Sequence, residues 1–157
     1  MQKITPFLWF DGQAEEAARY YTSIFKDSEI TGITHYGEGN FKPAGTVMTV
    51  NFTVLGMEFT ALNGGPEFKF TPAISFFIPC ESQAEVDEYW EILSESGDEG
   101  QCGWIMDKFG VTWQIVPTRL LELLQDEDPE KAMRVTQVMM PMHKIELNKL
   151  EAAYAAA

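Results

Sequence analysis

The sequence predicts an α+β fold built from two copies of one half-domain. Its opening is nearly repeated: the pair Thr5-Pro6, an apolar run and the triplet Gln13-Ala14-Glu15 recur as Thr71-Pro72, another apolar run and Gln83-Ala84-Glu85. The offset is 66 residues at the first pair and 70 at the triplet. Each copy is expected to form a strand, a short loop and a helix. A repeat this long is not a solenoid unit and indicates two half-domains, although two amphipathic helices can also look alike by chance.

The first copy is expected to hold four strands and one helix. A buried apolar strand covers residues 4–10, and Asp11 is expected to cap the helix whose apolar face carries Ala14, Ala18 and Tyr21. A further strand covers residues 29–36, and a loop rich in glycine and proline follows over residues 38–45. A strand at 46–54 and its partner at 57–62 form a hairpin, with a turn at Leu55-Gly56.

The strand at 46–54 alternates cleanly between apolar and polar side chains. Thr49, Asn51 and Thr53 fall on one face, opposite the apolar side chains. This polar stripe lines a cavity if the sheet closes around one, and otherwise it faces solvent. Both interpretations remain open.

The second copy follows a turn-rich connector. A strand is expected at residues 73–79, and Ser82 with Glu85 forms a capping box at the start of the next helix, which Gly97 is expected to end. A last strand covers residues 111–116. Pro117 stops this strand.

Three helices are expected after the repeat. They cover residues 119–125, the segment from the cap Asp128-Pro129 to 139, and residues 145–157. Four methionines in this region suit adaptable packing, either on the sheet or on a second subunit.

The composition narrows the class of partner. The chain has 157 residues, 45% of them hydrophobic and 13% aromatic, so it can build a packed core. Its formal net charge of -13 makes nucleic acid and anionic membrane surfaces poor partners. No long apolar segment or signal peptide is present, and two cysteines are too few for a disulfide scaffold, so a cytoplasmic location is expected.

Few residues point to chemistry. The two histidines lie far apart, and no zinc motif, nucleophile elbow or phosphate loop is present. Two segments, residues 61–70 and 99–114, concentrate aromatic side chains beside glycines, amides and a carboxylate. Such a mixture suits a pocket that stacks on a flat ligand. A tight hairpin stabilised by aromatic residues explains it equally well.

Four motifs are distinctive: the start Thr-Pro-Phe-Leu-Trp-Phe, the helix Gln-Ala-Glu-Glu-Ala-Ala-Arg-Tyr-Tyr, the segment from Leu62 to Phe68, and the run from Cys102-Gly103-Trp104 to Pro117. Together they resemble the PhnB-like family of the glyoxalase, bleomycin-resistance and extradiol-dioxygenase superfamily. The resemblance implies a single domain of two βαβββ modules, about 1–66 and 70–117, forming a curved sheet around a cleft. Helices at about 118–157 complete it, and a homodimer is usual.

The superfamily's enzymes hold a metal on four strand positions, usually His or Glu. The resemblance puts these positions near Thr5, Asn51, Ala73 and Gln114, none of which is His, Glu or Asp. Amides and hydroxyls alone bind a catalytic transition metal weakly. Neither a metal nor another cofactor is therefore expected.

Three hypotheses of function follow. The first is a metal-free protein that binds a small molecule. The second is an enzyme, either a methyltransferase, as the family is often labelled, or a metal-dependent lyase or dioxygenase; no glycine-rich turn for S-adenosylmethionine is evident. The third is a redox or thiol function of Cys102. No catalytic residue is assigned, but the ligand is expected to contact Thr5, Trp9, Asn51, Asn63, Glu67, Phe76, Trp104, Asp107, Trp113 and Gln114. Asp107 can instead cap the turn before Phe109-Gly110.

Overall fold

A computed structural model describes residues 2–156 of the chain. The chain divides into two compact units, one ending at Phe70 and the other beginning at Thr71. Each unit is described by itself.

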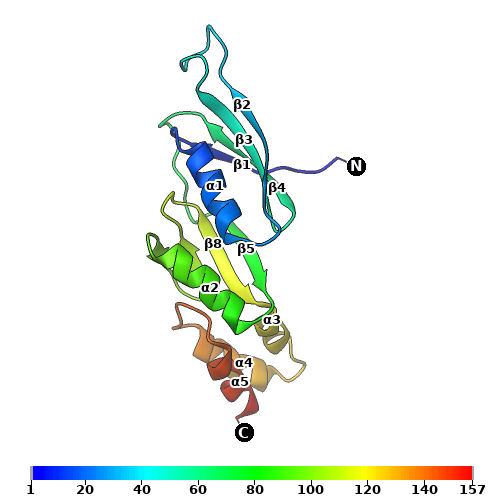
Figure 1. The fold of residues 1–157 in the computed structure, drawn as a ribbon. Helices are drawn as coiled ribbons and strands as arrows, with labels where there is room; N and C mark the ends of the chain where they lie inside the picture. Colours follow the sequence, from blue (N-terminus) through cyan, green and yellow to red (C-terminus); the bar gives the residue numbers. More distant parts are fainter. Residues whose placement is uncertain (1, 157) are drawn as a thin grey trace. The chain divides into compact units, whose positions relative to one another are not determined.

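The first unit is one βαβββ module (Figure 1). Its elements are β1 (Phe7–Phe10), α1 (Ala14–Ile24), β2 (Ile30–His35), β3 (Val47–Val54) and β4 (Met57–Asn63). The strand order is β1-β4-β3-β2, with β1 parallel to β4 and the other pairs antiparallel. The first strand is shorter than the expected 4–10.

The alternation of β3 sets the two faces of this sheet. Val50, Phe52 and Val54 are buried on the face that α1 covers, and α1 packs its own buried side chains against them. The β3–β4 hairpin turns at Leu55 and Gly56, with φ of 49° and 76°. Both values are those of a type I′ turn, whose twist matches that of the paired strands.

The predicted cap of α1 is wrong. Asp11 does not cap the helix; its first residue, Ala14, donates its backbone N–H to Asn63 Oδ1 over 2.9 Å. Asn63 Nδ2 in turn donates to the carbonyl of Val47 over 3.1 Å. A side chain at the end of β4 therefore satisfies one of the free N–H groups of the helix, and the sequence near α1 does not reveal it.

The second unit begins with the same module. Its elements are β5 (Ser75–Cys80), α2 (Gln83–Ser94), β6 (Asp98–Glu99), β7 (Trp104–Met106) and β8 (Thr112–Pro117). The order β5-β8-β7-β6 repeats that of the first unit, with β5 parallel to β8. The predicted α+β fold of two βαβββ modules is thus confirmed.

Helix α2 starts at the predicted capping box. Glu85 donates its N–H to Ser82 Oγ over 3.2 Å, and the Glu85 carboxylate accepts from the N–H of Glu81 over 2.7 Å. The predicted end of the helix is wrong, because α2 stops at Ser94. A Cβ at Gly97 would collide with the carbonyl oxygens of Leu93 and Met106, so this glycine permits a close approach of two segments.

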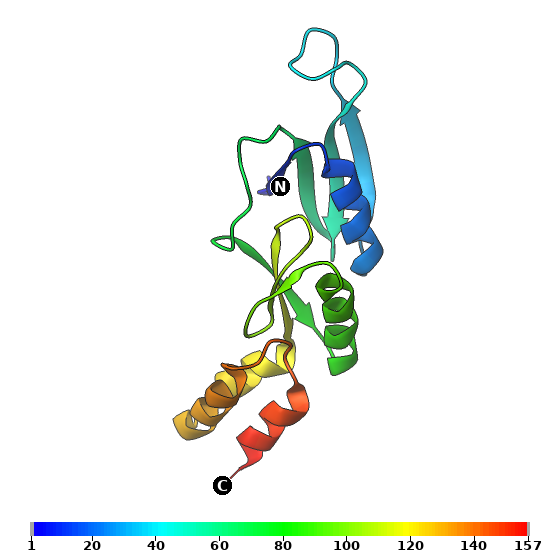
Figure 2. The ribbon, with the colours of Figure 1, turned by 90° about the vertical axis from the view of Figure 1, so that its left-hand side faces the viewer.

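Three helices complete the second unit: α3 (Thr118–Leu124), α4 (Pro129–Met139) and α5 (Leu147–Ala155) (Figure 2). Asp128 Oδ1 caps α4, as predicted, by accepting from the N–H of Glu130 over 2.9 Å. Residue 157, at the end of the last predicted helix, lies outside the described residues. Within residues 2–156, no helix is both long and apolar enough to cross a membrane.

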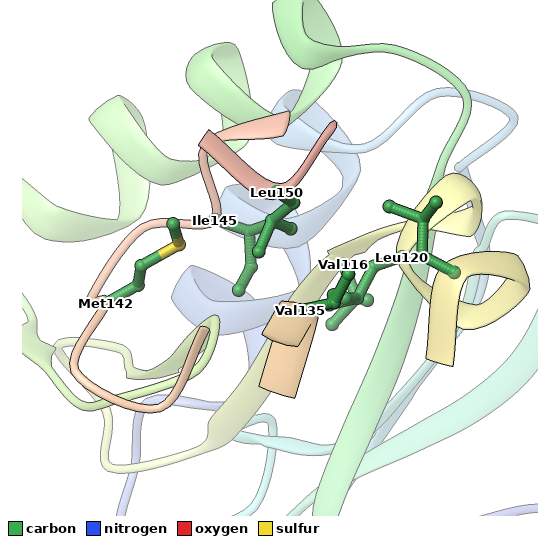
Figure 3. Close-up of a cluster of buried hydrophobic side chains, with 7 residues drawn as sticks. Val116, Leu120, Val135, Met142, Ile145 and Leu150 are labelled. Carbon is green, nitrogen blue, oxygen red and sulfur yellow. The ribbon is translucent and has the colours of Figure 1, made fainter. Parts of the chain in front are cut away.

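The helices share a core of their own with the end of β8 (Figure 3). It consists of the buried side chains of Val116, Leu120, Leu123, Val135, Met142, Ile145 and Leu150. The methionines of the C-terminal region differ in exposure: Met142 is buried in this core, whereas Met133 and Met140 are exposed. Burial of this cluster fixes the C-terminal helices to the second sheet.

Candidate functional site

The second unit contains a cavity of about 540 Å³ at strands β6–β8. This volume lies within the range of small-molecule sites. The cavity is lined by Pro72, Asp98, Glu99, Gly100, Gln101, Cys102, Trp104, Ile105, Met106 and Thr112. Trp104 and Met106 are paired with Gln114 and Thr112 across the sheet, so these four side chains share one face. The opposite face carries Ile105, which is fully buried.

One wall of the cavity is the turn from Gln101 to Trp104. Trp104 donates its N–H to the carbonyl of Gln101 over 3.1 Å, and the two central residues, Cys102 and Gly103, have φ of 56° and 83°. These are the features of a type I′ turn, in which Asn-Gly is the favoured pair. A cysteine in this left-handed region costs about 1–2 kcal/mol, so its conformation must be stabilised by its surroundings.

Thr112 belongs to the cavity lining and has a buried hydroxyl. Its side chain is only 4% exposed, and Oγ1 has no hydrogen-bond partner among the described residues. A buried polar group without a partner costs about 1–3 kcal/mol. A ligand with a polar edge would supply the missing partner.

The charges around the cavity favour some ligands over others. Asp98 and Glu99 are exposed, and none of the residues described around the cavity is basic. Glu99 Oε1 accepts from the indole N–H of Trp90 over 2.9 Å, which fixes its carboxylate. Two carboxylates in a chain of net charge -13 oppose an anionic ligand and tolerate a neutral or cationic one.

Four of the five predicted ligand contacts in the second unit separate into two groups. Trp104 lines the cavity, and Gln114 lies on the same face, where its Nε2 donates to Ser75 Oγ over 2.8 Å. Phe76 and Trp113 belong to the opposite face, with ring centroids 5.5 Å apart, and Trp113 is fully buried. These two rings therefore pack on the face of the sheet opposite Trp104 and Gln114.

Asp107 is held by its own turn. Its Oδ1 accepts from the N–H groups of Phe109 and Val111 over 2.8 and 3.0 Å, and Oδ2 accepts from the indole of Trp113 over 2.9 Å. The residue is 3% exposed. The expected capping function is therefore present, and both carboxylate oxygens are already bonded.

The five predicted contacts in the first unit lie in or beside β1, in β3, at the end of β4 and in the connector that follows. Trp9 donates its indole N–H to the carbonyl of Gly65 over 2.9 Å, and its ring packs on Gly64, where a Cβ would overlap it. Glu67 lies beside Gly65, and Asn51 Oδ1 accepts from Thr60 Oγ1 over 2.9 Å. Thr5 is half-buried ahead of β1.

Asn63, the remaining one, borders a separate cavity of about 450 Å³ in the first unit. Tyr36 also lines it and donates its hydroxyl to the carbonyl of Asn63 over 2.7 Å. Both polar groups of the Asn63 side chain serve the fold, as described above. The Asn63 amide is therefore already bonded within the first unit, although the residue lines this cavity.

The superfamily's metal does not fit the residues present. The four positions carry a hydroxyl, two amides and an alanine, and the two amides are engaged by Thr60 and Ser75. Among the described residues, no three His, Cys, Asp or Glu side chains lie close enough to share an ion. Neutral oxygen donors alone hold transition metals weakly.

Comparison with known proteins identifies relatives of the two modules. A family model described as 3-demethylubiquinone-9 3-methyltransferase matches residues 2–116. A solved PhnB protein from Bacillus cereus is 39% identical with a TM-score of 0.68, and the match covers 74% of this chain and 99% of that one. A protein from Pseudomonas aeruginosa is 21% identical with a TM-score of 0.62, covering 74% and 98%, which shows a common fold. No curated protein matches the chain.

The family match ends at residue 116, so helices α3, α4 and α5 lie beyond it. The two modules carry the topology that the motifs implied, and the resemblance found in the sequence is confirmed. The chain therefore belongs to the PhnB-like family whose model is described as 3-demethylubiquinone-9 3-methyltransferase.

Proposed function

We propose that this protein binds a neutral or cationic planar organic molecule in the 540 Å³ cavity of the second unit. The observation that carries the proposal is Thr112, a residue of the cavity lining whose buried hydroxyl has no partner among the described residues. Trp104 and Met106 supply apolar surface on the same face, on which a flat ring can stack. The binding requires no metal ligand.

The chemistry of the lining favours a substituted phenol or quinone. Such a molecule has an apolar ring for Trp104 and an oxygen for the Thr112 hydroxyl, and it carries no negative charge toward Asp98 and Glu99. The family description names a demethylated ubiquinone, which belongs to this class. This likeness supports the choice of a first ligand to test.

Isothermal titration with 2,3-dimethoxy-5-methylhydroquinone tests the proposal. Thr112→Val removes the hydroxyl at nearly constant volume, and we expect it to weaken binding about 2- to 12-fold, the equivalent of one neutral hydrogen bond. Thr112→Ser keeps the hydroxyl and is the matched control, with affinity near that of the wild type. The anion 4-hydroxybenzoate should bind more weakly than the hydroquinone. Absence of binding by the wild type, or equal affinity of the Val and Ser variants, would contradict the proposal.

A second candidate is transfer of a methyl group to a compound of the same class. The match of residues 2–116 to the family model favours it through the description of that model. Titration with S-adenosylmethionine is one test. The other is mass spectrometry, after incubation with S-adenosylmethionine, of 3-hydroxy-2-methoxy-5-methylhydroquinone, which has a free hydroxyl in place of one methoxy group as the methyl acceptor. A bound cofactor and a product heavier by one methylene would establish the transferase, and neither would be seen for a binding protein. A metal-dependent lyase or dioxygenase is less well supported, because the four strand positions lack anionic and imidazole donors.

We also propose that the protein forms a homodimer, as expected from the family resemblance. Met133 of α4 and Met140, directly after α4, are 60% and 55% accessible and offer adaptable apolar surface for such a contact. Size-exclusion chromatography with light scattering should give twice the chain mass of 17.8 kDa. A mass of one chain would refute the dimer.

A further inference from the structure

The segment between α4 and α5 bonds directly to the wall of the cavity. The central residues of the type I′ turn, Cys102 and Gly103, donate their N–H groups to the carbonyls of Met142 and His143 over 2.7 and 2.9 Å. In a hairpin turn these donors usually meet water. Here consecutive carbonyls of a segment outside the family match accept from them.

Side chains tighten the same contact. His143 Nδ1 lies 2.6 Å from the carbonyl oxygen of Gly100, and because a carbonyl only accepts, the imidazole donates. A Cβ at Gly103 would lie 2.7 Å from the carbonyl of Ile115 and 3.2 Å from the side chain of Ile145. Glycine therefore lets the turn approach both β8 and the segment.

Helix α2 anchors the other end of the segment. Gln83 donates to the carbonyl of Ile145 over 2.9 Å and accepts from the N–H of Leu147 over 2.7 Å. Lys144 Nζ forms an ion pair with Asp87 over 2.7 Å. Residues 142–147 are thus bonded at one end to the cavity wall and at the other to α2, the helix of the second βαβββ module.

We infer that residues 142–147 are a positioning element that holds the turn at 101–104 and thereby sets the affinity and selectivity of the cavity. The inference rests on the proposed function, since it concerns the same cavity. It adds a specific task for the C-terminal helices: their buried core fixes the segment, and the segment fixes the wall. Relatives whose chains end after the last strand of the module would have to hold this turn in another way.

Two variants loosen the segment without replacing a residue of the cavity lining. His143→Ala removes the bond to Gly100, and Gln83→Ala removes both bonds to Ile145 and Leu147. His143→Asn places an amide nitrogen near the position of Nδ1 and is the conservative rescue. Lys149→Ala breaks an exposed ion pair with Glu146 in the same region and is the control.

Three measurements report on the wall and on the ligand. Amide hydrogen exchange of Cys102 and Gly103, and reaction of the Cys102 thiol with 5,5′-dithiobis(2-nitrobenzoate), need no ligand; Cys80 is fully buried and does not react in the folded protein. Titration with 2,3-dimethoxy-5-methylhydroquinone gives the affinity. We expect exchange at least tenfold faster, thiol reaction at least threefold faster and binding several-fold weaker in the two Ala variants, with wild-type values in His143→Asn and Lys149→Ala.

The outcomes separate the inference from the proposed function. Unchanged exchange and thiol reactivity in both Ala variants would overturn the inference, as would a loosened wall with unchanged affinity. If the wild type binds no hydroquinone, the proposed function fails, and exchange of Cys102 and Gly103 alone then decides whether the segment holds the wall. Faster exchange would support the positioning of the turn, and wild-type exchange would refute it.

Discussion

Replacing Asp107 with Asn tests whether this carboxylate belongs to the fold. The buried side chain accepts three hydrogen bonds, two at Oδ1 from the turn amides of Phe109 and Val111 and one at Oδ2 from the indole of Trp113. Asparagine keeps one acceptor oxygen and turns the other atom into a donor. One N–H group therefore loses its partner and faces another donor.

The size of the effect follows from these three bonds. A hydrogen bond to a charged acceptor contributes about 1.5–3 kcal/mol, and a buried donor left without a partner costs about 1–3 kcal/mol. With the two Oδ1 bonds retained at lower strength and the indole bond lost, we expect Asp107→Asn to lower the free energy of unfolding by about 3 kcal/mol. This is a large share of the stability of a small protein.

Urea unfolding followed by circular dichroism measures this change. Asp98→Asn alters an exposed carboxylate nearby and should change stability by less than about 0.5 kcal/mol. Equal stability of the wild type and the Asp107 variant would refute the structural assignment of Asp107 and return it to the set of ligand contacts. Trp113→Phe should also destabilise, because it leaves Oδ2 without its indole partner.

Three further predictions concern single sites. Cys102→Asn should leave the stability unchanged or raise it by up to about 1 kcal/mol in thermal unfolding, because asparagine tolerates the left-handed turn position better than cysteine; a loss above 1 kcal/mol would contradict this. Asn63→Ala should cost about 2 kcal/mol in urea unfolding, from the lost helix cap and the lost bond to Val47, and a near-neutral result would refute the cap. The hydrogen bond from Lys144, followed by that from Gln83, lowers the pKa of Asp87 below 3.8, so its contribution to stability is present at neutral pH and is lost as the pH falls through the lowered value. Asp87→Asn should therefore flatten the loss of stability below pH 4 in acid titrations, whereas an unchanged acid profile would exclude the linkage.

Much of the fold could be predicted from local patterns. The alternation of β3 and the turn at Leu55-Gly56 specify a hairpin, and Ser82 with Glu85 specifies the start of α2. The repeat predicts two similar modules, and both sheets have the same strand order. The equivalent elements end 70 residues apart, β1 and β5 at Phe10 and Cys80 and α1 and α2 at Ile24 and Ser94, so they follow the offset of the triplet and not that of the Thr-Pro pairs.

The cavity was only partly predictable, although the sequence contains a signal for it. In β8, Thr112 and Gln114 alternate with Trp113 and Ile115, which predicts opposite faces for the polar and the large apolar side chains. Grouping the aromatic residues as one pocket lining overlooks this alternation. It assigns the buried Trp113 to the ligand and leaves out Thr112.

Other features depend on contacts between distant segments. The cap of α1 comes from Asn63, and the carbonyls that accept from the turn at Cys102 belong to Met142 and His143. No periodicity or local motif encodes such pairs, because each arises only after two elements have packed. The bonding of the C-terminal segment to the cavity wall could therefore be found only in the structure.

The location of the ligand site is tested most directly by nuclear magnetic resonance of the ¹⁵N-labelled protein during titration with 2,3-dimethoxy-5-methylhydroquinone. The account predicts saturable shifts of the amides of Thr112 and Met106, the indole N–H of Trp104 and the turn at 101–104, with little change around the cavity that Asn63 borders. Saturable shifts confined to the first unit, or no shifts at millimolar hydroquinone, would contradict the assignment of this cavity as the binding site.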